Sequence, residues 1–311
     1  MMPGNILFFI FSLIAVWIGA GIIVASLDRI SRRLEISAFA ASFFILGLLT
    51  SLPELSVGIN SIIEKKPEIF VGDLIGGSMI LFLMVIPLLS VLGNGVTLSH
   101  QLTRRKLIFA LYVVGLPTLL TIDNNFTRIE GLLLIFMYFV LFYKMEKKKG
   151  LMDHFRDKFA LHKKNTVRDA GKILAGAFIV YMASAVLVEN TIYFSKVLSV
   201  SPYLLSLLGL SIGTNLPEIS IALRTVTYGK KDIALGDYIG SAAANSLILG
   251  VLAIINGQVI TFTNHLSITF LMMTLGLFLF YRFTRSKNDI SRVEGFLLFL
   301  VYLVFFILEM K

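Results

Sequence analysis

The chain has 311 residues, of which 57% are hydrophobic and only 15% charged, with no cysteine. A soluble domain of this size could not bury so much apolar surface, so the lipid bilayer must be the solvent for much of the chain. The lack of cysteine excludes disulfides, thiolate metal sites and cysteine nucleophiles.

Ten apolar runs alternate with charged or turn-rich segments along the chain. They lie at 6–27, 37–63, 69–93, 106–122, 129–143, 171–189, 198–224, 233–256, 264–283 and 293–309. We therefore predict an all-α membrane protein with ten transmembrane helices, organised as two inverted five-helix repeats. Residues 1–143 form the first repeat and 171–311 the second. The basic segment 144–170 between them is either a solvated cytoplasmic linker or a helix lying on the lipid surface.

The basic residues indicate how the chain crosses the membrane. Of the 28 Lys and Arg residues, 23 lie in or beside the loops after the first, third, fifth, seventh and ninth runs. The positive-inside rule places these loops in the cytoplasm and both termini outside, most simply in the cell membrane of a prokaryote. The net charge of +9 therefore reflects topology and gives no reason to expect a nucleic-acid partner. The oligomeric state is left open.

Two segments repeat without a gap at an offset of 164 residues, namely 50–76 and 214–240. The identical pairs include Thr50/Thr214, Leu52/Leu216, Pro53/Pro217, Glu54/Glu218, Ser56/Ser220, Gly72/Gly236, Asp73/Asp237 and Gly76/Gly240. Chance is a poor explanation, because many of these residues are polar or helix-breaking. Since an odd number of spans precedes the linker, equivalent residues should approach the bilayer midplane from opposite faces.

Proline interrupts both repeated helices near mid-membrane. A proline inside a helix removes one hydrogen bond and displaces the carbonyl four residues earlier. Pro53 and Pro217 should therefore loosen the carbonyls of Leu49 and Gly213, which need new partners in hydrocarbon. A bound cation is one such partner, although a lone proline could also be a simple kink.

Each proline is followed by a glutamate and preceded by a threonine about one turn earlier. Glu54, Glu218, Thr50 and Thr214 thus supply the carboxylate and hydroxyl oxygens that hard cations such as Ca²⁺ and Na⁺ prefer. A charge at the bilayer centre costs about 3 kcal/mol or more. A divalent cation between the glutamates would neutralise both, and protons or monovalent cations could replace it, as in an exchanger. The alternative is a structural, protonated pair.

The following apolar run adds further oxygen atoms. Asp237, Ser241 and Asn245 are spaced four apart and share one helix face, whereas the equivalent face of the first half carries Asp73 and Gly77. The second half therefore offers more side-chain oxygens here. The two aspartates could alternatively be ordinary helix caps, and the repeated glycines could serve only close helix packing.

At these residues the sequence resembles the cation/Ca²⁺ exchanger superfamily, in particular its Na⁺/Ca²⁺ exchanger branch. That branch carries G-T-S-L-P-E in two inverted repeats, each followed by G-N-x-x-G-S-N-x-x-N/D. The motifs stand here as L-T-S-L-P-E at 49–54 and G-T-N-L-P-E at 213–218. The G-N-A-A-E version usual in proton/Ca²⁺ exchangers is absent. The resemblance implies a secondary antiporter that exchanges Ca²⁺ for Na⁺ by alternating access and holds no cofactor besides the transported ions.

Position by position, the resemblance implies that Glu54 and Glu218 are the central acidic ligands. It adds side-chain or backbone oxygens from Thr50, Thr214, Ser51, Asn215, Ser241, Asn245, Gly47 and Ser211. Asn215 stands in place of a family serine. Asp73 and Asp237, which replace family asparagines, complete the candidate set.

Three further departures fall beside this set. Gly77 and Leu81 replace a serine and an asparagine of the family motif, and Ala242 replaces another asparagine. Ser78 follows Gly77 directly, but one step along a helix turns the side chain by about 100°, so Ser78 points away from the position of the family serine. These changes could alter the number of Na⁺ bound, the coupling ion (H⁺ for Na⁺) or the divalent substrate. A cation channel remains a less favoured class. An intramembrane enzyme is not expected, since H-E-x-x-H and deeply buried histidines are absent.

Overall fold

The computed structural model describes residues 2–33, 47–97, 103–145, 163–228, 231–262, 266–287 and 289–310. The first half contains α1 (Met2–Arg33), α3 (Gly47–Thr50), α4 (Leu52–Ile63), α5 (Glu68–Ile80), the π-helical turn η2 (Leu81–Val85), α6 (Ile86–Leu92), α7 (Arg104–Leu120) and α8 (Arg128–Met145). The second contains α10 (Lys163–Leu198), α11 (Pro202–Leu205), the π-helical turn η3 (Ser206–Leu210), α12 (Ser211–Thr214), α13 (Leu216–Tyr228), α14 (Lys231–Asn256), α15 (Ser267–Lys287) and α16 (Arg292–Glu309).

Helical segments overlap every predicted run, so the mostly helical prediction is confirmed. Within the described residues, five stretches are long and apolar enough to cross a membrane, in α1, α5 to α6, α10, α14 and α15. α10 begins at Lys163 and is longer than the run predicted from residue 171. Residues 37–46 of the second run and 146–162 of the predicted linker lie outside the described residues.

Two short antiparallel strand pairs depart from the all-α prediction. β1 (Val96–Thr97) pairs with β4 (Asp289–Ile290), and β2 (Asn125–Phe126) pairs with β3 (Ile260–Thr261). The offset of 164 relates β1 to β3 and β2 to β4. The pair of β1 with β4 is therefore the repeat equivalent of the pair of β3 with β2. Each pair ties a connection of the first half to one of the second.

The helices that carry the repeated motifs cross at small residues in the centre of the molecule. A Cβ atom on Gly47 in α3 would lie 2.6 Å from the carbonyl carbon of Gly240 in α14. A Cβ on Gly76 in α5 would lie 2.9 Å from the Cβ of Ser211 in α12. The offset pairs Gly47 with Ser211 and Gly240 with Gly76, so the two crossings are equivalent. The close helix packing expected of Gly76 and Gly240 is confirmed.

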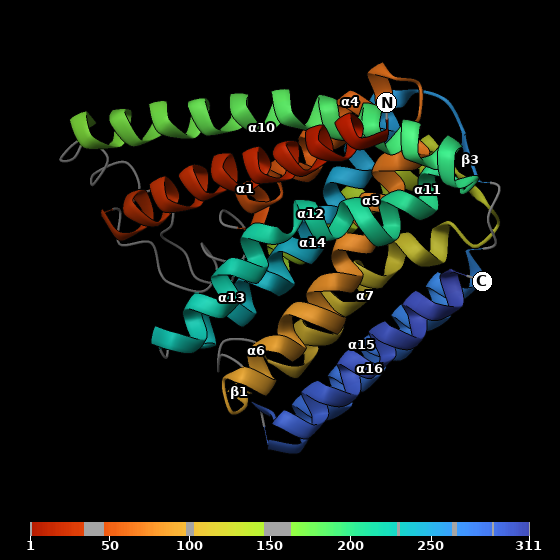
Figure 1. The fold of residues 1–311 in the computed structure, drawn as a ribbon. Helices are drawn as coiled ribbons and strands as arrows, with labels where there is room; N and C mark the ends of the chain where they lie inside the picture. Colours follow the sequence, from red (N-terminus) through yellow and green to blue (C-terminus); the bar gives the residue numbers. More distant parts are fainter. Residues whose placement is uncertain are drawn as a thin grey trace.

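The long helices α1 and α10 lie side by side along one edge of the molecule (Figure 1). A Cβ on Gly19 would lie 2.9 Å from the carbonyl oxygen of Gly176, and one on Gly176 would lie 2.7 Å from that of Gly19. The two backbones therefore approach each other at glycines, as is common where membrane helices pack.

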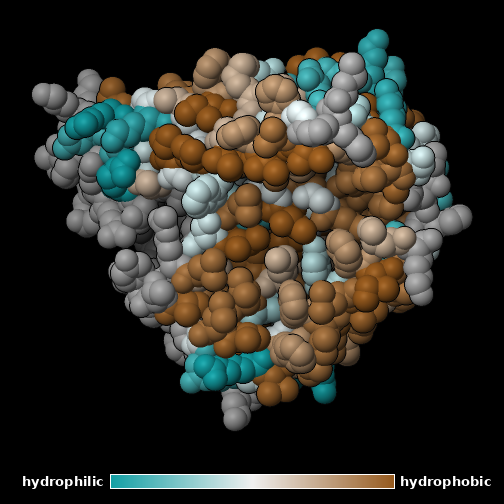
Figure 2. All heavy atoms as spheres, in the orientation of Figure 1, coloured by the Kyte–Doolittle hydropathy of each residue, from teal (hydrophilic) through white to brown (hydrophobic). Residues whose placement is uncertain are grey.

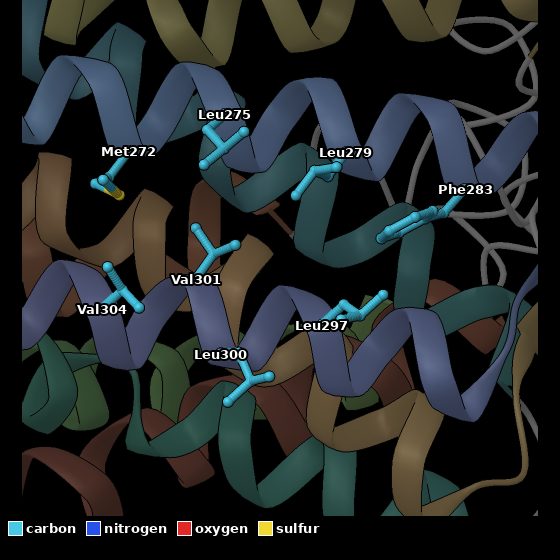
Figure 3. A pocket seen from close by; sticks show the side chains of 8 residues that line it. All are labelled: Met272, Leu275, Leu279, Phe283, Leu297, Leu300, Val301 and Val304. Atoms are coloured by element: carbon cyan, nitrogen blue, oxygen red, sulfur yellow. The ribbon is translucent and has the colours of Figure 1, made fainter.

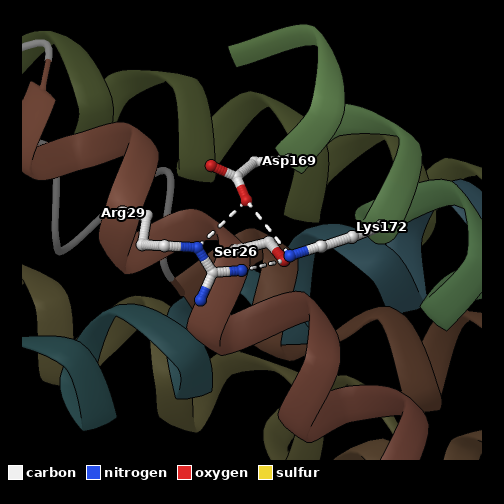
Figure 4. A network of polar contacts seen from close by, with 4 residues as sticks. All are labelled: Ser26, Arg29, Asp169 and Lys172. Carbon is white, nitrogen blue, oxygen red and sulfur yellow. Dashed lines mark hydrogen bonds and ion pairs between the residues drawn. The ribbon is translucent and has the colours of Figure 1, made fainter. Parts of the chain in front are cut away.

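An ion pair joins α1 and α10 near one end (Figure 4). Arg29 Nε donates to Asp169 Oδ1 at 3.0 Å, and Arg29 Nη2 donates to Ser26 Oγ at 2.9 Å. Lys172 Nζ lies 4.0 Å from the same Asp169 oxygen. The Asp169 side chain is 4% exposed, so its charge is buried between the helices and neutralised by two cations.

The outer surface is largely apolar. Figure 2 shows broad hydrophobic areas on the viewed face, with hydrophilic residues collected at its margins. A groove of about 340 Å³ between α15 and α16 (Figure 3) is lined by Met272, Leu275, Leu279, Phe283, Leu297, Leu300, Val301 and Val304. These side chains offer no oxygen ligand, so this groove is not a candidate cation site.

Candidate cation site

Both proline-containing helices are interrupted at equivalent positions. α3 gives way to α4 at Ser51, whose φ and ψ are −83° and 13°. α12 gives way to α13 at Asn215, whose φ and ψ are −89° and 10°. Pro53 and Pro217 follow as the second residues of α4 and α13. The interruption predicted from the prolines is therefore confirmed in both halves.

At the helix interruption of the first half, the hydroxyl groups of Thr50, Ser51 and Ser241 lie together with the backbone carbonyl of Gly47. Ser51 Oγ and Thr50 Oγ1 donate to the carbonyl oxygen of Gly47 at 2.9 and 3.2 Å. Both hydroxyl oxygens also lie 3.2 Å from Ser241 Oγ of α14. The hydroxyls of Thr50, Ser51 and Ser241 are thus brought together, and these three residues and Gly47 are buried.

In the second half, the carbonyl of Ser211 occupies the equivalent position. It accepts hydrogen bonds from Asn215 Nδ2 at 2.9 Å and from Thr214 Oγ1 at 3.3 Å. The backbone N–H of Asn215 donates to the same Ser211 carbonyl at 3.2 Å. The release of the Gly213 carbonyl by Pro217 stays a prediction.

The two glutamates occupy the first turns of α4 and α13. Glu54 is 1% exposed and Glu218 is fully buried. Each lies at a helix N-terminus, where the backbone dipole favours a negative charge. Glu54 Oε1 accepts from Asn215 Nδ2 at 3.3 Å. The structure therefore places a carboxylate of the first repeat against the helix interruption of the second.

Asp73 belongs to this site and is not a helix cap. It lies in the middle of α5, fully buried, and its Oδ1 accepts from Thr214 Oγ1 of the other repeat at 3.0 Å. The cap interpretation fails because the first turn of α5 begins at Glu68. The side chain of Asp237 lies outside the described residues, so its assignment stays a prediction.

Asn245 reaches the site from α14. Its Nδ2 lies 3.5 Å from both the carbonyl oxygen of Leu74 and Ser78 Oγ of α5. Ser78 Oγ donates to the same Leu74 carbonyl at 3.1 Å. Leu81 stands at the position equivalent to Asn245 and is fully buried, so the first half supplies no counterpart to that amide.

Several buried acceptor atoms have no hydrogen-bond partner among the described residues. They include Glu54 Oε2, Asp73 Oδ2 and Asn245 Oδ1. A buried polar atom without a partner is costly, so each of these oxygens is suited to accept a cation as its partner. In the described part of the chain, no three acidic or histidine side chains converge as a metal cluster. The donors are thus mainly neutral oxygens around separate carboxylates, which suits hard cations.

One contact was not anticipated from the sequence. The Tyr238 hydroxyl donates to the backbone carbonyl of Glu218 at 3.4 Å, and the tyrosine side chain is fully buried. The repeat places Leu74 opposite Tyr238. The sequence signal for this contact is the tyrosine that replaces a leucine of the first repeat directly after the repeated aspartate.

The sequence matches the family described as "Sodium/calcium exchanger protein" over residues 4–144 and 170–311. A relative named sodium/calcium exchanger MaX1, from Methanosarcina acetivorans, is 25% identical, and the similarity covers 99% of each chain.

Two kinds of solved structure share the fold. One, described as the sodium-calcium exchanger NCX_Mj soaked with Na⁺ and Sr²⁺, is 20% identical with a TM-score of 0.67 and 98% of each chain covered. The other, described as the H⁺/Ca²⁺ exchanger CAX, is 15% identical with a TM-score of 0.79. That likeness covers 98% of this chain and 86% of the other.

Proposed function

The chain belongs to the sodium/calcium exchanger protein family, and we propose that it is a secondary antiporter that exchanges Ca²⁺ for Na⁺ across the cell membrane. The family consists of transporters, and the proposal requires no catalysis and no resident cofactor, since Ca²⁺ and Na⁺ are cargo. The full topology is part of the proposal: ten spans, two inverted halves and both termini outside.

The observation that carries this proposal is the pair of buried glutamates at two interrupted helices of opposite halves. Glu54 and Glu218 each lie in the first turn of a helix segment, and each has a backbone carbonyl and a threonine hydroxyl about one turn earlier. Two carboxylates with neutral oxygens around them form a set that Ca²⁺ or several Na⁺ ions would satisfy in turn. An empty site of this charge is costly in hydrocarbon, so exchange is favoured over uncoupled release.

Alternating access requires a part that moves past the site, and α1 with α10 is the best candidate. These helices are tied to each other by glycine packing and by the ion pair between Arg29 and Asp169. They reach the interrupted helices of both halves. Asn60 Nδ2 of α4 donates to Ser184 Oγ of α10 at 2.9 Å, and Trp17 Nε1 of α1 donates to Ser220 Oγ of α13 at 2.8 Å.

In the proposed topology α4 and α13 lead from the site toward opposite membrane faces. Movement of α1 and α10 toward one of them would cover that route and uncover the other. The helices that carry the carboxylates would then stay in place.

The proposal is tested in vesicles that contain the purified protein. Vesicles loaded with Na⁺ and diluted into Na⁺-free buffer should accumulate ⁴⁵Ca²⁺, and a Na⁺ ionophore should abolish the uptake. Protein-free vesicles and vesicles loaded with K⁺ are the controls. If neither a Na⁺ gradient nor a pH gradient drives uptake, the exchanger assignment is wrong.

Proton coupling is the second candidate, and two observations favour it. The fold agrees with that of the H⁺/Ca²⁺ exchanger CAX at a TM-score of 0.79, and Asp73 adds a third buried carboxyl group to the site. In this case a pH gradient alone would drive ⁴⁵Ca²⁺ uptake into Na⁺-free vesicles. Uptake that requires Na⁺ and ignores the pH gradient would reject it.

A further inference from the structure

The two sides of the site differ at one pair of repeat-related positions. The offset of 164 pairs Ser51 with Asn215 and Ser241 with Gly77. On the side of Ser51 and Ser241, the two hydroxyl oxygens lie 3.2 Å apart, with Thr50 Oγ1 also 3.2 Å from Ser241 Oγ. Each hydroxyl has two lone pairs and only one hydrogen, so this side can turn several lone pairs toward a cation.

On the other side, an amide group fills the equivalent space. Gly77 has no side chain, and a Cβ atom placed on it would lie 2.9 Å from Asn215 Nδ2. The same Cβ would lie 3.1 Å from Asn245 Nδ2. The larger side chain at Asn215 and the missing one at Gly77 thus compensate for each other in volume, but amide nitrogen replaces hydroxyl oxygen.

The hydrogen bonds determine which end of the Asn215 amide faces the site. Its Nδ2 lies 2.9 Å from the Ser211 carbonyl oxygen, 3.3 Å from Glu54 Oε1 and 3.4 Å from Thr214 Oγ1. The carbonyl and the carboxylate only accept. Thr214 has one hydrogen, which goes to Asp73 Oδ1 or to the Ser211 carbonyl, so its oxygen is left to accept from the amide. An amide oxygen in this position would face three other oxygens.

The partners of this nitrogen are a carboxylate, a backbone carbonyl and a hydroxyl. These are the oxygen types that a Na⁺ ion takes as ligands. We propose that the Asn215 amide takes the place of one monovalent cation. A Na⁺ position then remains beside Thr50, Ser51 and Ser241, while the repeat-related position is filled by the protein itself. The inference rests on the proposed function and predicts fewer Na⁺ ions per Ca²⁺ than in a site with hydroxyls on both sides.

The test exchanges the two sides. The double variant Gly77→Ser with Asn215→Ser gives the second side the hydroxyl pair of the first. The mirror variant Ser51→Asn with Ser241→Gly gives the first side the amide and the glycine. The single variants complete the cycle. Gly77→Ser alone crowds the amide and Asn215→Ser alone leaves a void, so both singles should fold less well than the double variant.

The readouts are the number of ²²Na⁺ ions bound per purified protein at saturation and the Hill slope for Na⁺ in Ca²⁺ exchange. The first double variant should bind one more Na⁺ than the unaltered chain and show a steeper Na⁺ dependence. The mirror variant should bind one fewer. A folded double variant with an unchanged Na⁺ count would overturn the inference and leave Asn215 as a packing residue.

Direct binding separates this inference from the proposed function. If the unaltered chain shows no Na⁺-driven ⁴⁵Ca²⁺ uptake, the proposed coupling to Na⁺ fails. The ²²Na⁺ count of the double variant still decides the role of Asn215 in that case. A gain of one Na⁺ supports the inference without any transport, and no gain rejects it.

Discussion

The residue that precedes Leu-Pro-Glu is Ser51 in the first half and Asn215 in the second, and each side chain meets a different environment. The Ser51 hydroxyl lies 3.2 Å from the hydroxyl of Ser241, whereas the Asn215 amide nitrogen lies 3.3 Å from a carboxylate oxygen of Glu54. The helix interruptions, the carbonyls before them and the glutamates after them are the same in both halves. The repeat therefore conserves the backbone scaffold and the charges, and the halves diverge in the neutral groups around them.

This division has a physical reason. An interrupted helix and a buried carboxylate are each costly in a membrane, so neither is retained without the other features that satisfy it. A hydroxyl can be exchanged for an amide at smaller cost, because both can hydrogen-bond to nearby carbonyls. The neutral groups are therefore where the number and type of bound ions can change.

The largest effect is expected from the buried glutamates, which both halves share. Glu54→Gln and Glu218→Gln keep the size and one oxygen of the side chain but remove its charge. Each should reduce ⁴⁵Ca²⁺ uptake by about 100-fold or more, since loss of a ligand exceeds the loss seen for a supporting group. Glu64→Gln, at the exposed end of α4, is the matched control and should transport normally. Near-normal uptake by either site variant would show that the halves are not equivalent in their carboxylates.

The next effect tests the equivalent helix crossings. A Cβ on Gly76 would lie 2.7 Å from Ser211 Oγ, and one on Gly47 would lie 2.6 Å from the carbonyl carbon of Gly240. Gly76→Ala and Gly47→Ala should therefore each destabilise the fold by about 1–3 kcal/mol. Thermal stability in detergent, followed by size-exclusion chromatography, measures this.

Gly21→Ala provides the control for both crossings. Gly21 lies on α1, where an added Cβ would meet no neighbouring side chain or helix within 4 Å, so alanine there should not lower stability. If either crossing variant is as stable as Gly21→Ala, the close approach of the helices at that crossing is not required.

Asp73 gives a smaller effect that distinguishes the halves. Its carboxylate accepts from Thr214 of the opposite repeat and keeps one oxygen without a partner among the described residues. Asp73→Asn retains the first contact and removes the charge, so we expect the Ca²⁺ concentration for half-maximal uptake to rise about tenfold. Asp123→Asn, in an exposed connection, is the control. An unchanged Ca²⁺ dependence would exclude Asp73 from the ligand set.

The sequence predicted the shared scaffold well because the required residues are conspicuous there. Proline and glutamate are rare in apolar runs, and their repetition at one offset located both helix interruptions and both buried carboxylates. The same offset also relates β1 to β3 and β2 to β4, which shows that the repeat extends beyond the segment where residue identity reveals it.

The sequence did not predict the contacts between the halves. The hydrogen bond from Thr214 to Asp73, and that from Asn215 to Glu54, join residues 141 and 161 positions apart. The first depends on how α5 and α12 cross, and the second on how the helix interruptions of the two halves meet. Helix crossing is set by the packing of small side chains rather than by hydropathy. For the same reason the sequence left Asp73 open between a helix cap and a residue of the site.

The smallest expected effect concerns α1 and α10, whose two ends are held differently. Near one end Arg29 and Asp169 form the ion pair, and near the other Phe9 and Phe194 meet edge to face with centroids 5.7 Å apart. Because the Arg29 side chain is 40% exposed, its removal in Arg29→Gln should cost only about 1 kcal/mol. Lys172 would still neutralise Asp169 in this variant.

Asp169→Asn should cost more than Arg29→Gln, because it leaves Arg29 and Lys172 facing each other without the carboxylate. Thermal stability of both single variants and of the double variant gives the coupling energy between Arg29 and Asp169. A positive coupling together with slower Ca²⁺ exchange would indicate that the two helices move as one unit. Zero coupling would mean that glycine packing at Gly19 and Gly176 and the contact of Phe9 with Phe194 hold the helices together without help from the ion pair.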